Sequence, residues 1–310
     1  MGKLIDGIWK KGTIVTSNKK GSYDRLPRTF RETISKNHEI FKPEKNRYHL
    51  YVSYACPWAH RTLIYRKLKG LEDYISVSVV NPDMLENGWT FKTDFKGVTI
   101  DHIFNKNYLY EIYQEADSDI TTSVTVPILW DKKNNTIVNN ESSEIIRIFN
   151  TSFDHLTGNT KNFYPEKYQK QINQMNDLIY ENINNGVYKC GFAKNQESYD
   201  AALENLFESL NQIESILKKS SYLVGEQLTE ADLRLIPTLL RFDIVYFTHF
   251  KCNKKRILDF HNLSLYRKRI YELNAVKSTT FFDHIKRHYY FSHEMINPYR
   301  IVPTGPDDFI

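Results

Sequence analysis

A cysteine at the expected start of a helix is the clearest candidate for chemistry in this chain. Cys56 follows an extended apolar run over residues 48–54 and directly precedes Pro57. Proline suits the first helical position, where its missing N–H would have had no partner. The positive end of the helix dipole then faces the sulfur and favours thiolate over thiol. The sequence predicts that Cys56 is a nucleophile, and the alternative is a small buried apolar residue.

The elements around Cys56 follow from hydrophobic patterning. A strand over 48–54, a helix over 57–69 and a strand over 75–80 make a βαβ unit. A long connection over 81–123 is expected to frame a pocket, because loops of this length in compact domains are usually functional. Strands over 124–130 and 136–139 with a turn over 132–135 form a hairpin, and residues 141–144 open another helix. Pro127 interrupts the first hairpin strand, which indicates an edge, a bulge or a cis bond.

The sequence predicts helices throughout the chain beyond about residue 163. Thr229 and Asp232 have the spacing of a helix-capping pair. Apolar residues recur at intervals of three and four in two sets: Ile172, Met175, Ile179 and Ile183, then Leu203, Leu206, Leu210, Ile213 and Leu217. We therefore expect an N-terminal arm over 1–47, an α/β domain over 48–155 and an all-α domain over 163–310.

Composition excludes several classes of protein. With 310 residues, 41% of them hydrophobic, the chain can bury the cores of two domains. We expect a cytoplasmic protein without a membrane span or signal peptide, because no apolar run is long enough for either. Three widely spaced cysteines argue for a reducing compartment and against a disulfide framework. The net charge of +5 comes from interspersed charges, so nucleic acid is not an expected partner, and no histidine or cysteine spacing predicts a metal site.

Several sequence strings, in order along nearly the whole chain, carry a family resemblance. The chain resembles the glutathione transferase superfamily, with its thioredoxin-like domain and C-terminal helical bundle domain. Within that superfamily it is most similar to the glutathionyl-hydroquinone reductases, the Xi class. The strings are CPWAHR (56–61), VTVPILWD (124–131), NNESSEIIR (139–147), NNGVYKCGFA (184–193), LTEADLRLIPTLLRFDIVYFTHFKCN (228–253) and HIKRHYYFSHEMINP (284–298).

The resemblance implies roles for residues in the thioredoxin-like domain. Cys56 would take the glutathionyl group of a glutathionyl-hydroquinone as a mixed disulfide, which a second glutathione resolves. Glu141 and Ser142 would bind the γ-glutamyl end of glutathione, although the sequence alone favours a helix N-cap with an acidic first turn. Pro127 would be a cis-proline that turns the backbone of Val126 toward the cysteinyl part of glutathione. The alternative is an edge-strand proline beside an ordinary core valine.

The resemblance also assigns aromatic residues. Tyr188 and Tyr289 would hydrogen-bond the quinone oxygens and supply a proton to the ring carbon, although Tyr290 is an alternative to its neighbour. Phenols suit this task because they donate a proton while neutral. Trp89 would pack beside glutathione, and otherwise would anchor the core. Ser123 departs from the pattern, because many relatives carry a basic residue there.

The function implied is glutathione-dependent reduction of glutathionyl-hydroquinones by a homodimer, with glutathione as co-substrate and no metal. One alternative is an omega-like thioltransferase or dehydroascorbate reductase, which needs Cys56 but not the tyrosines. A second alternative is a non-catalytic, transferase-like scaffold. A scaffold gives no reason for a thiol at a helix start, the Glu141–Ser142 pair and two phenols to occur together, so we favour the reductase.

Overall fold

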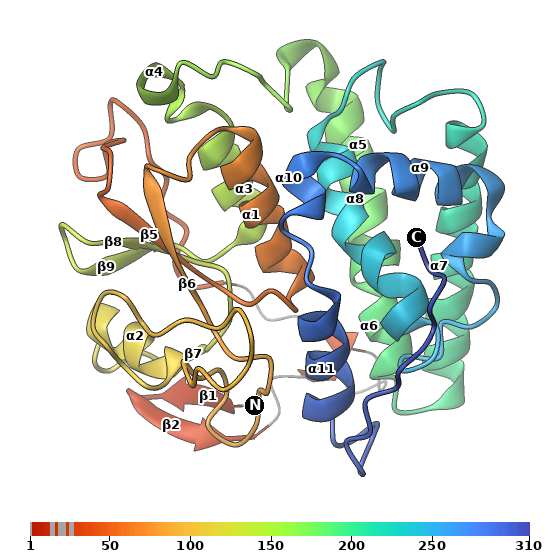
Figure 1. The fold of residues 1–310 in the computed structure, drawn as a ribbon, viewed down its shortest axis with the longest axis horizontal. Coiled ribbons are helices and arrows are strands. Elements are labelled where there is room, and N and C mark those ends of the chain that lie inside the picture. The colour runs from red at the N-terminus through yellow and green to blue at the C-terminus, as the bar shows by residue number, and fades with distance from the viewer. Residues whose placement is uncertain (1, 13–15, 18–22, 25–27) are drawn as a thin grey trace. The chain divides into compact units, whose positions relative to one another are not determined.

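The computed structural model describes residues 2–12, 16–17, 23–24 and 28–310, and these divide into two units (Figure 1). The first unit contains the described residues within 1–14, 26–162 and 279–288. The second contains those within 15–25, 163–278 and 289–310. The domain boundaries drawn from the sequence stay predictions. Residues 1, 13–15, 18–22 and 25–27 of the expected arm lie outside the described residues.

The first unit has a thioredoxin-like sheet of four strands, in the order β6, β5, β8, β9. The strands β5 and β6 are parallel, whereas β5 with β8 and β8 with β9 are antiparallel. The βαβ and ββα patterns predicted from the sequence are thus confirmed. The bounds are β5 Tyr48–Val52, α1 Pro57–Leu68, β6 Ile75–Val79, β8 Ile128–Asp131, β9 Thr136–Asn139, α3 Ser142–Thr151 and α4 Asp154–Thr157.

Burial explains why these segments form a sheet covered by helices. All five residues of β5 are buried, as expected for a central strand enclosed on both faces. Helices α1 and α3 lie side by side (Figure 1). Ile145, Ile148 and Phe149 recur at helical spacing along α3 and are all buried. Helix α1 begins at Pro57, with Cys56 as its N-cap residue, and has Arg66 and Lys67 in its last turn, where cations suit the helix dipole.

A second, three-stranded sheet joins the start of the chain to the long connection, and the sequence analysis does not predict it. Strands β1 (Gly2–Ile5) and β2 (Ile8–Lys11) form a hairpin, and β1 also pairs with β7 (Thr122–Ser123). Asp6 and Gly7 both have positive φ, at 47° and 69°, as the tight hairpin turn requires. The register places Lys3 opposite Ser123. A basic residue therefore lies next to the position where the family pattern has one.

The first unit also includes a segment from near the end of the chain. Phe281 stacks on Tyr54 with ring centroids 3.8 Å apart. Arg287 forms two hydrogen bonds with the carboxylate of Asp83, at 2.7 and 2.8 Å. The ring of His284 bonds the carbonyl of Lys96 at 2.6 Å. Residues 279–288 therefore hold both the start of α1 and the long connection in place.

The second unit is helical, apart from a short antiparallel pair. The longest helix, α7, buries all five leucines and isoleucines of its predicted apolar face. At the start of α8, the Asp232 carboxylate accepts hydrogen bonds from Thr229 N and Oγ1, which confirms the predicted capping pair. The bounds are β3 Thr16–Ser17, β4 Tyr23–Asp24, η1 Glu166–Tyr168, α5 Gln169–Leu178, η2 Ile179–Asn184, α6 Gly186–Gly191, α7 Gln196–Leu217, α8 Glu230–Arg241, η3 Phe242–Tyr246, η4 Ile257–Asp259, α9 His261–Tyr271 and α10 Asn274–Lys277. Helix α11, Phe282–Ser292, has residues in both units.

Candidate active site

The sulfur of Cys56 lies at the N-terminus of α1, beside the segment that leads into β8. Cys Sγ is 3.6 Å from the carbonyl oxygen of Val126, within hydrogen-bonding distance for a sulfur donor. The peptide bond between Val126 and Pro127 is cis. Cys56 is partly exposed, whereas Cys190 and Cys252 are buried. The structure thus brings two of the predicted site residues together and leaves the thiol accessible, as a nucleophile requires.

Glu141 and Ser142 lie at the start of α3. The Oε1 atom of Glu141 accepts hydrogen bonds from Ser143 N and Ser143 Oγ, both at 3.0 Å, and from Ser142 Oγ at 3.4 Å. Glu141 is therefore the N-cap of the helix, which is the simpler of the two interpretations given above. An N-cap carboxylate beside helix-start amides also has the groups that bind an ammonium and a carboxylate. The ligand-binding role of this pair stays a prediction.

Trp89 lies in the long connection and is buried. Its indole stacks on the imidazole of His288, with ring centroids 4.7 Å apart and planes at 23°. His288 Nδ1 bonds the carbonyl of Pro82 at 2.8 Å. His288 and His284 therefore both bond carbonyls of the long connection. Trp89 serves as an anchor for the loop in this arrangement, and its contact with glutathione stays a prediction.

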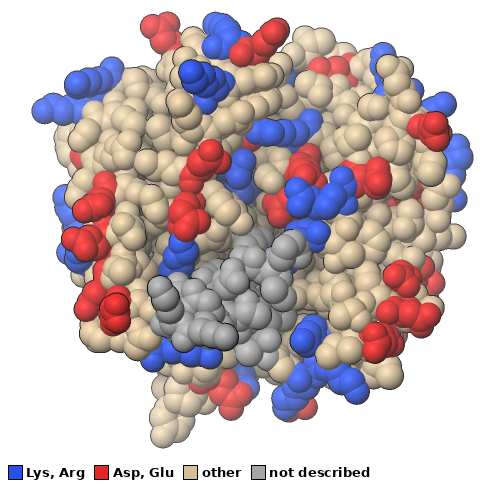
Figure 2. All heavy atoms as spheres, turned by 180° about the vertical axis from the view of Figure 1, so that it is seen from behind, with Lys and Arg blue, Asp and Glu red and all other residues tan. Residues whose placement is uncertain are grey.

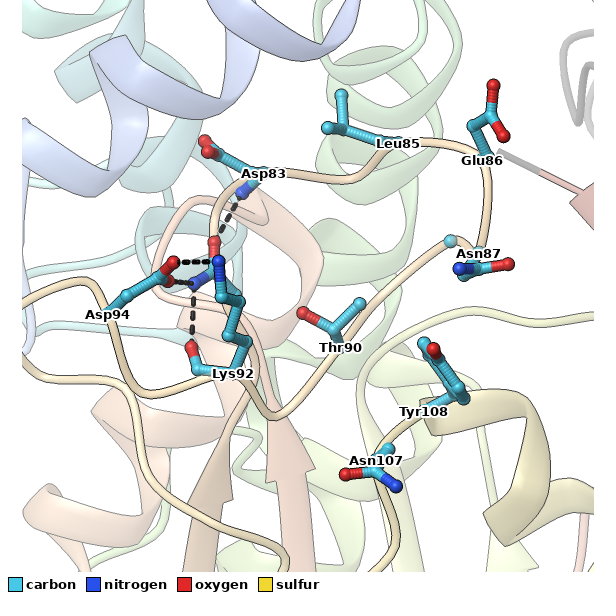
Figure 3. A pocket seen from close by; sticks show the side chains of 11 residues that line it. Asp83, Leu85, Glu86, Asn87, Thr90, Lys92, Asp94, Asn107 and Tyr108 are labelled. Carbon is cyan, nitrogen blue, oxygen red and sulfur yellow. Dashed lines mark hydrogen bonds and ion pairs between the residues drawn. The ribbon is translucent and has the colours of Figure 1, made fainter.

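The long connection frames a pocket of about 490 Å³, as its length predicts (Figure 3). Asn81 organises one side: its Nδ2 donates to Lys92 O and to Asp94 Oδ1, and its Oδ1 accepts from Asp83 N. The lining is polar and includes neither Cys56 nor Trp89. It consists of Asn81, Asp83, Leu85, Glu86, Asn87, Gly88, Thr90, Lys92, Asp94, Asn107 and Tyr108.

The tyrosines predicted for the site lie together in the second unit. The hydroxyl oxygens of Tyr188 and Tyr289 are 2.6 Å apart, and Tyr246 adds a third phenol 2.9 Å from Tyr289. Burial raises the pKa of Tyr289 well above its usual value, and the neighbouring phenols add to the effect, so this group is neutral. Tyr290 instead donates to the carbonyl of Ile244 at 3.2 Å. The pairing with Tyr188 therefore involves Tyr289.

Tyr246 is a member of this cluster that the sequence does not reveal. It is one of 21 tyrosines, and its spacing from Tyr188 and Tyr289 follows no short-range pattern. Its only signal is its position within the family string over 228–253. Contact between residues so far apart in the sequence becomes visible only when the helices are packed.

The residues beside Cys56 in α1 are held by packing. The Arg61 guanidinium lies over the ring of Trp58, 4.6 Å from its centroid. His60 is buried, and its Nε2 bonds the hydroxyl of Thr279 at 3.1 Å. Both side chains therefore make contacts that fix the first turns of α1.

Basic and acidic side chains are interspersed over the face drawn in Figure 2. Among the residues that the structure describes, no helix is long and apolar enough to cross a membrane. The same residues contain no group of three or more His, Cys, Asp or Glu side chains arranged to hold a metal ion.

Comparison with known proteins gives a consistent result over the whole chain. Two family models match: the glutathione S-transferase N-terminal domain over residues 55–152 and the C-terminal domain over residues 196–269. Glutathionyl-hydroquinone reductase YqjG of Escherichia coli (strain K12) is 52% identical over 99% of this chain and 95% of its own length.

Solved structures agree. The glutathione S-transferase Xi of Phanerochaete chrysosporium has a TM-score of 0.93 and 51% identity, covering 95% of this chain and 96% of its own. The glutathione-bound structure of YqjG from Escherichia coli K-12 has a TM-score of 0.91 and 51% identity, covering 99% and 96%. This chain belongs to the glutathionyl-hydroquinone reductases, the Xi-class enzymes of the glutathione transferase superfamily.

Proposed function

We propose that this enzyme reduces glutathionyl-hydroquinones to hydroquinones, with glutathione as its co-substrate and Cys56 as its nucleophile. The observation that carries the proposal is the position of Cys56: a partly exposed cysteine at the N-cap position of α1, with its sulfur next to the backbone carbonyl of Val126. A helix N-terminus stabilises the thiolate that attacks sulfur. The glutathione-bound structure of the Escherichia coli relative supports glutathione as the thiol substrate.

The reaction has two steps at sulfur, and each is accompanied by the transfer of one proton. The Cys56 thiolate attacks the glutathionyl sulfur, forming an S–S bond while the sulfur–carbon bond of the substrate breaks. The electron pair of that bond passes to the ring carbon, which takes a proton from Tyr188, and hydroquinone leaves. A second glutathione attacks the mixed disulfide, releases oxidised glutathione and regenerates the Cys56 thiolate, and its thiol proton returns to Tyr188. The substrate carbon is reduced and two glutathione sulfurs end as a disulfide.

We assign glutathione binding to the first unit. Glu141 would bind the ammonium of the γ-glutamyl group, and the hydroxyl of Ser142 with the α3 amides would bind its carboxylate. The backbone of Val126 would pair with the cysteinyl part, and Trp89 would pack beside the tripeptide. A homodimeric state and a cytoplasmic location remain predictions from the family resemblance and the composition.

Removal of both phenols separates this function from a general thioltransferase. In the double variant Tyr188→Phe, Tyr289→Phe, hydroquinone release should fall about 10²- to 10⁴-fold, the range of general acid catalysis. Exchange of glutathione with a small mixed disulfide should be retained, because that reaction protonates no carbon. Hydroquinone is measured chromatographically, and oxidised glutathione is measured by a coupled reductase assay. Equal loss of both activities, or of neither, would contradict the proposed role of the phenols.

A further inference from the structure

A chain of three phenols reaches from the partly exposed Tyr188 into the core of the second unit. Tyr289 lies in its middle, with its oxygen 2.6 Å from that of Tyr188 and 2.9 Å from that of Tyr246. We propose that Tyr246 is a positioning residue: it holds the hydroxyl of Tyr289 as a donor toward Tyr188 and so directs the proton of Tyr188 to the substrate. The proposal rests on the function proposed above.

The number of protons on the three phenols fixes the direction in which Tyr246 must donate. Each phenol has one proton to donate. If Tyr188 gives its proton to the substrate carbon, the bond between Tyr188 and Tyr289 must use the proton of Tyr289. Tyr289 has then no proton left, so its bond with Tyr246 must use the proton of Tyr246. Only one direction of donation along the chain is productive, and Tyr246 is the group that sets it.

The same direction stabilises the charge that forms. When Tyr188 loses its proton, its oxygen becomes negative and accepts a hydrogen bond from Tyr289. Donors that act in series polarise one another, so a hydrogen bond from Tyr246 strengthens the donor character of Tyr289. Without the hydroxyl of Tyr246, Tyr289 can rotate and accept from Tyr188, which turns the proton of Tyr188 away from the substrate.

Packing holds the ring of Tyr246 without help from its hydroxyl. Tyr246 and Tyr289 are both buried, and their rings meet edge to face with centroids 5.5 Å apart. On its other side, the Tyr246 ring stacks on Phe250 with centroids 5.4 Å apart and planes at 19°. Phenylalanine would keep both ring contacts. A Tyr246→Phe variant therefore isolates the effect of one oxygen atom.

The backbone at two of the phenols is unusual. The π-helical segment η3 ends at Tyr246, and the π-helical segment η2 ends two residues before α6, the helix that carries Tyr188. Such wide turns are rare and occur frequently at functional sites, where they change the direction of a side chain. Two π-helical segments next to one hydrogen-bonded chain support a functional role for these phenols. They also associate Tyr246 with Tyr188.

The test compares Tyr246→Phe with Tyr290→Phe, which loses a buried hydroxyl bonded to a backbone carbonyl outside the phenol chain. With a glutathionyl-hydroquinone as substrate, Tyr246→Phe should lower kcat about tenfold, the factor expected for one lost hydrogen bond, with KM nearly unchanged. Its exchange of glutathione with a small mixed disulfide should match the wild type. Tyr290→Phe should retain both activities. Thermal unfolding of both variants verifies that the fold is retained.

A double variant gives an independent readout. If Tyr246 acts through Tyr289, adding Tyr246→Phe to Tyr289→Phe should cause no further loss, whereas a general structural effect would add to it. An unchanged kcat in Tyr246→Phe, or additive losses in the double variant, would overturn the proposal. If the wild-type enzyme itself released no hydroquinone, the proposed function would be overturned instead. Failure of the proposed role of Tyr246 can therefore be distinguished from failure of the proposed function.

Discussion

Replacement of Cys56 by Ser should lower hydroquinone release by at least about 10³-fold, the scale of losing a catalytic nucleophile. A serine hydroxyl in the same place is not ionised at neutral pH and forms no mixed disulfide with glutathione. The partial exposure of this position makes the change mild for packing, so the thermal unfolding midpoint should stay near the wild-type value. Activity is measured by chromatography of hydroquinone and unfolding by circular dichroism.

The matched control for this experiment is a variant that keeps only the proposed nucleophile. Cys190 and Cys252 are buried, so their replacement by Ala should cost stability but leave the thiol chemistry intact. After reaction of this double variant with a glutathionyl-hydroquinone, mass spectrometry should find one glutathione adduct, on Cys56. Retained activity in Cys56→Ser, or an adduct on another residue in the wild type, would refute the mechanism.

The largest expected effect on stability comes from the buried ion pair of Arg47 and Asp131. Two hydrogen bonds join the guanidinium to the carboxylate, at 2.9 and 2.6 Å, and the side chains are 4% and 0% exposed. Asp131→Ala leaves the Arg47 charge buried without this partner. The free energy of unfolding should therefore fall by about 3–5 kcal/mol, measured by chemical denaturation. A double variant, Arg47→Met with Asp131→Leu, should recover much of the loss, because it removes both charges.

The same pair predicts a dependence on pH. Burial alone would raise the pKa of Asp131, but hydrogen bonds from Arg47, the Lys133 backbone and Asn134 outweigh it and hold the pKa below its usual value. The pair therefore stabilises the fold above the pKa of an unfolded aspartate, and this stability is lost as the pH falls through the folded pKa. Asp131→Ala should flatten the acid limb of the stability curve. The exposed pair of Arg256 and Asp259 is the control: Arg256 also lowers the pKa of Asp259, but solvent screens this pair, so Asp259→Ala should change that limb far less than Asp131→Ala does.

Much of the fold around Cys56 is predictable from the sequence. The boundaries of β5, α1 and β6 agree with the predicted ranges to within two residues, because alternation, Pro57 and the following turn are local signals. The β1–β2 hairpin was missed, although Asp6-Gly7 is a strong turn signal. Its strands have only four residues each, and β2 is largely exposed, so apolar periodicity hardly marks the hairpin.

The candidate site is less predictable, because it depends on contacts between distant segments. The position of Glu141 can be predicted from the start of the helix that it caps. Its proposed role in binding glutathione comes only from the family resemblance. Tyr246 carries no local signal at all. The stacking of Trp89 on His288 joins residues almost two hundred positions apart, which periodicity cannot reveal. Patterning predicts elements well, but it does not predict which side chains meet.

The contribution of residues 279–288 to the first unit has a consequence for how the protein is made. These residues follow the helical segment 163–278 in the sequence, so a ribosome synthesises them after most of the chain. Until they emerge, Tyr54 lacks its stacking partner and Asp83 lacks Arg287. The thioredoxin-like unit therefore cannot complete its packing until translation is nearly finished. In a nascent chain stalled before Thr279, the segment that leads into α1 should be accessible to proteases.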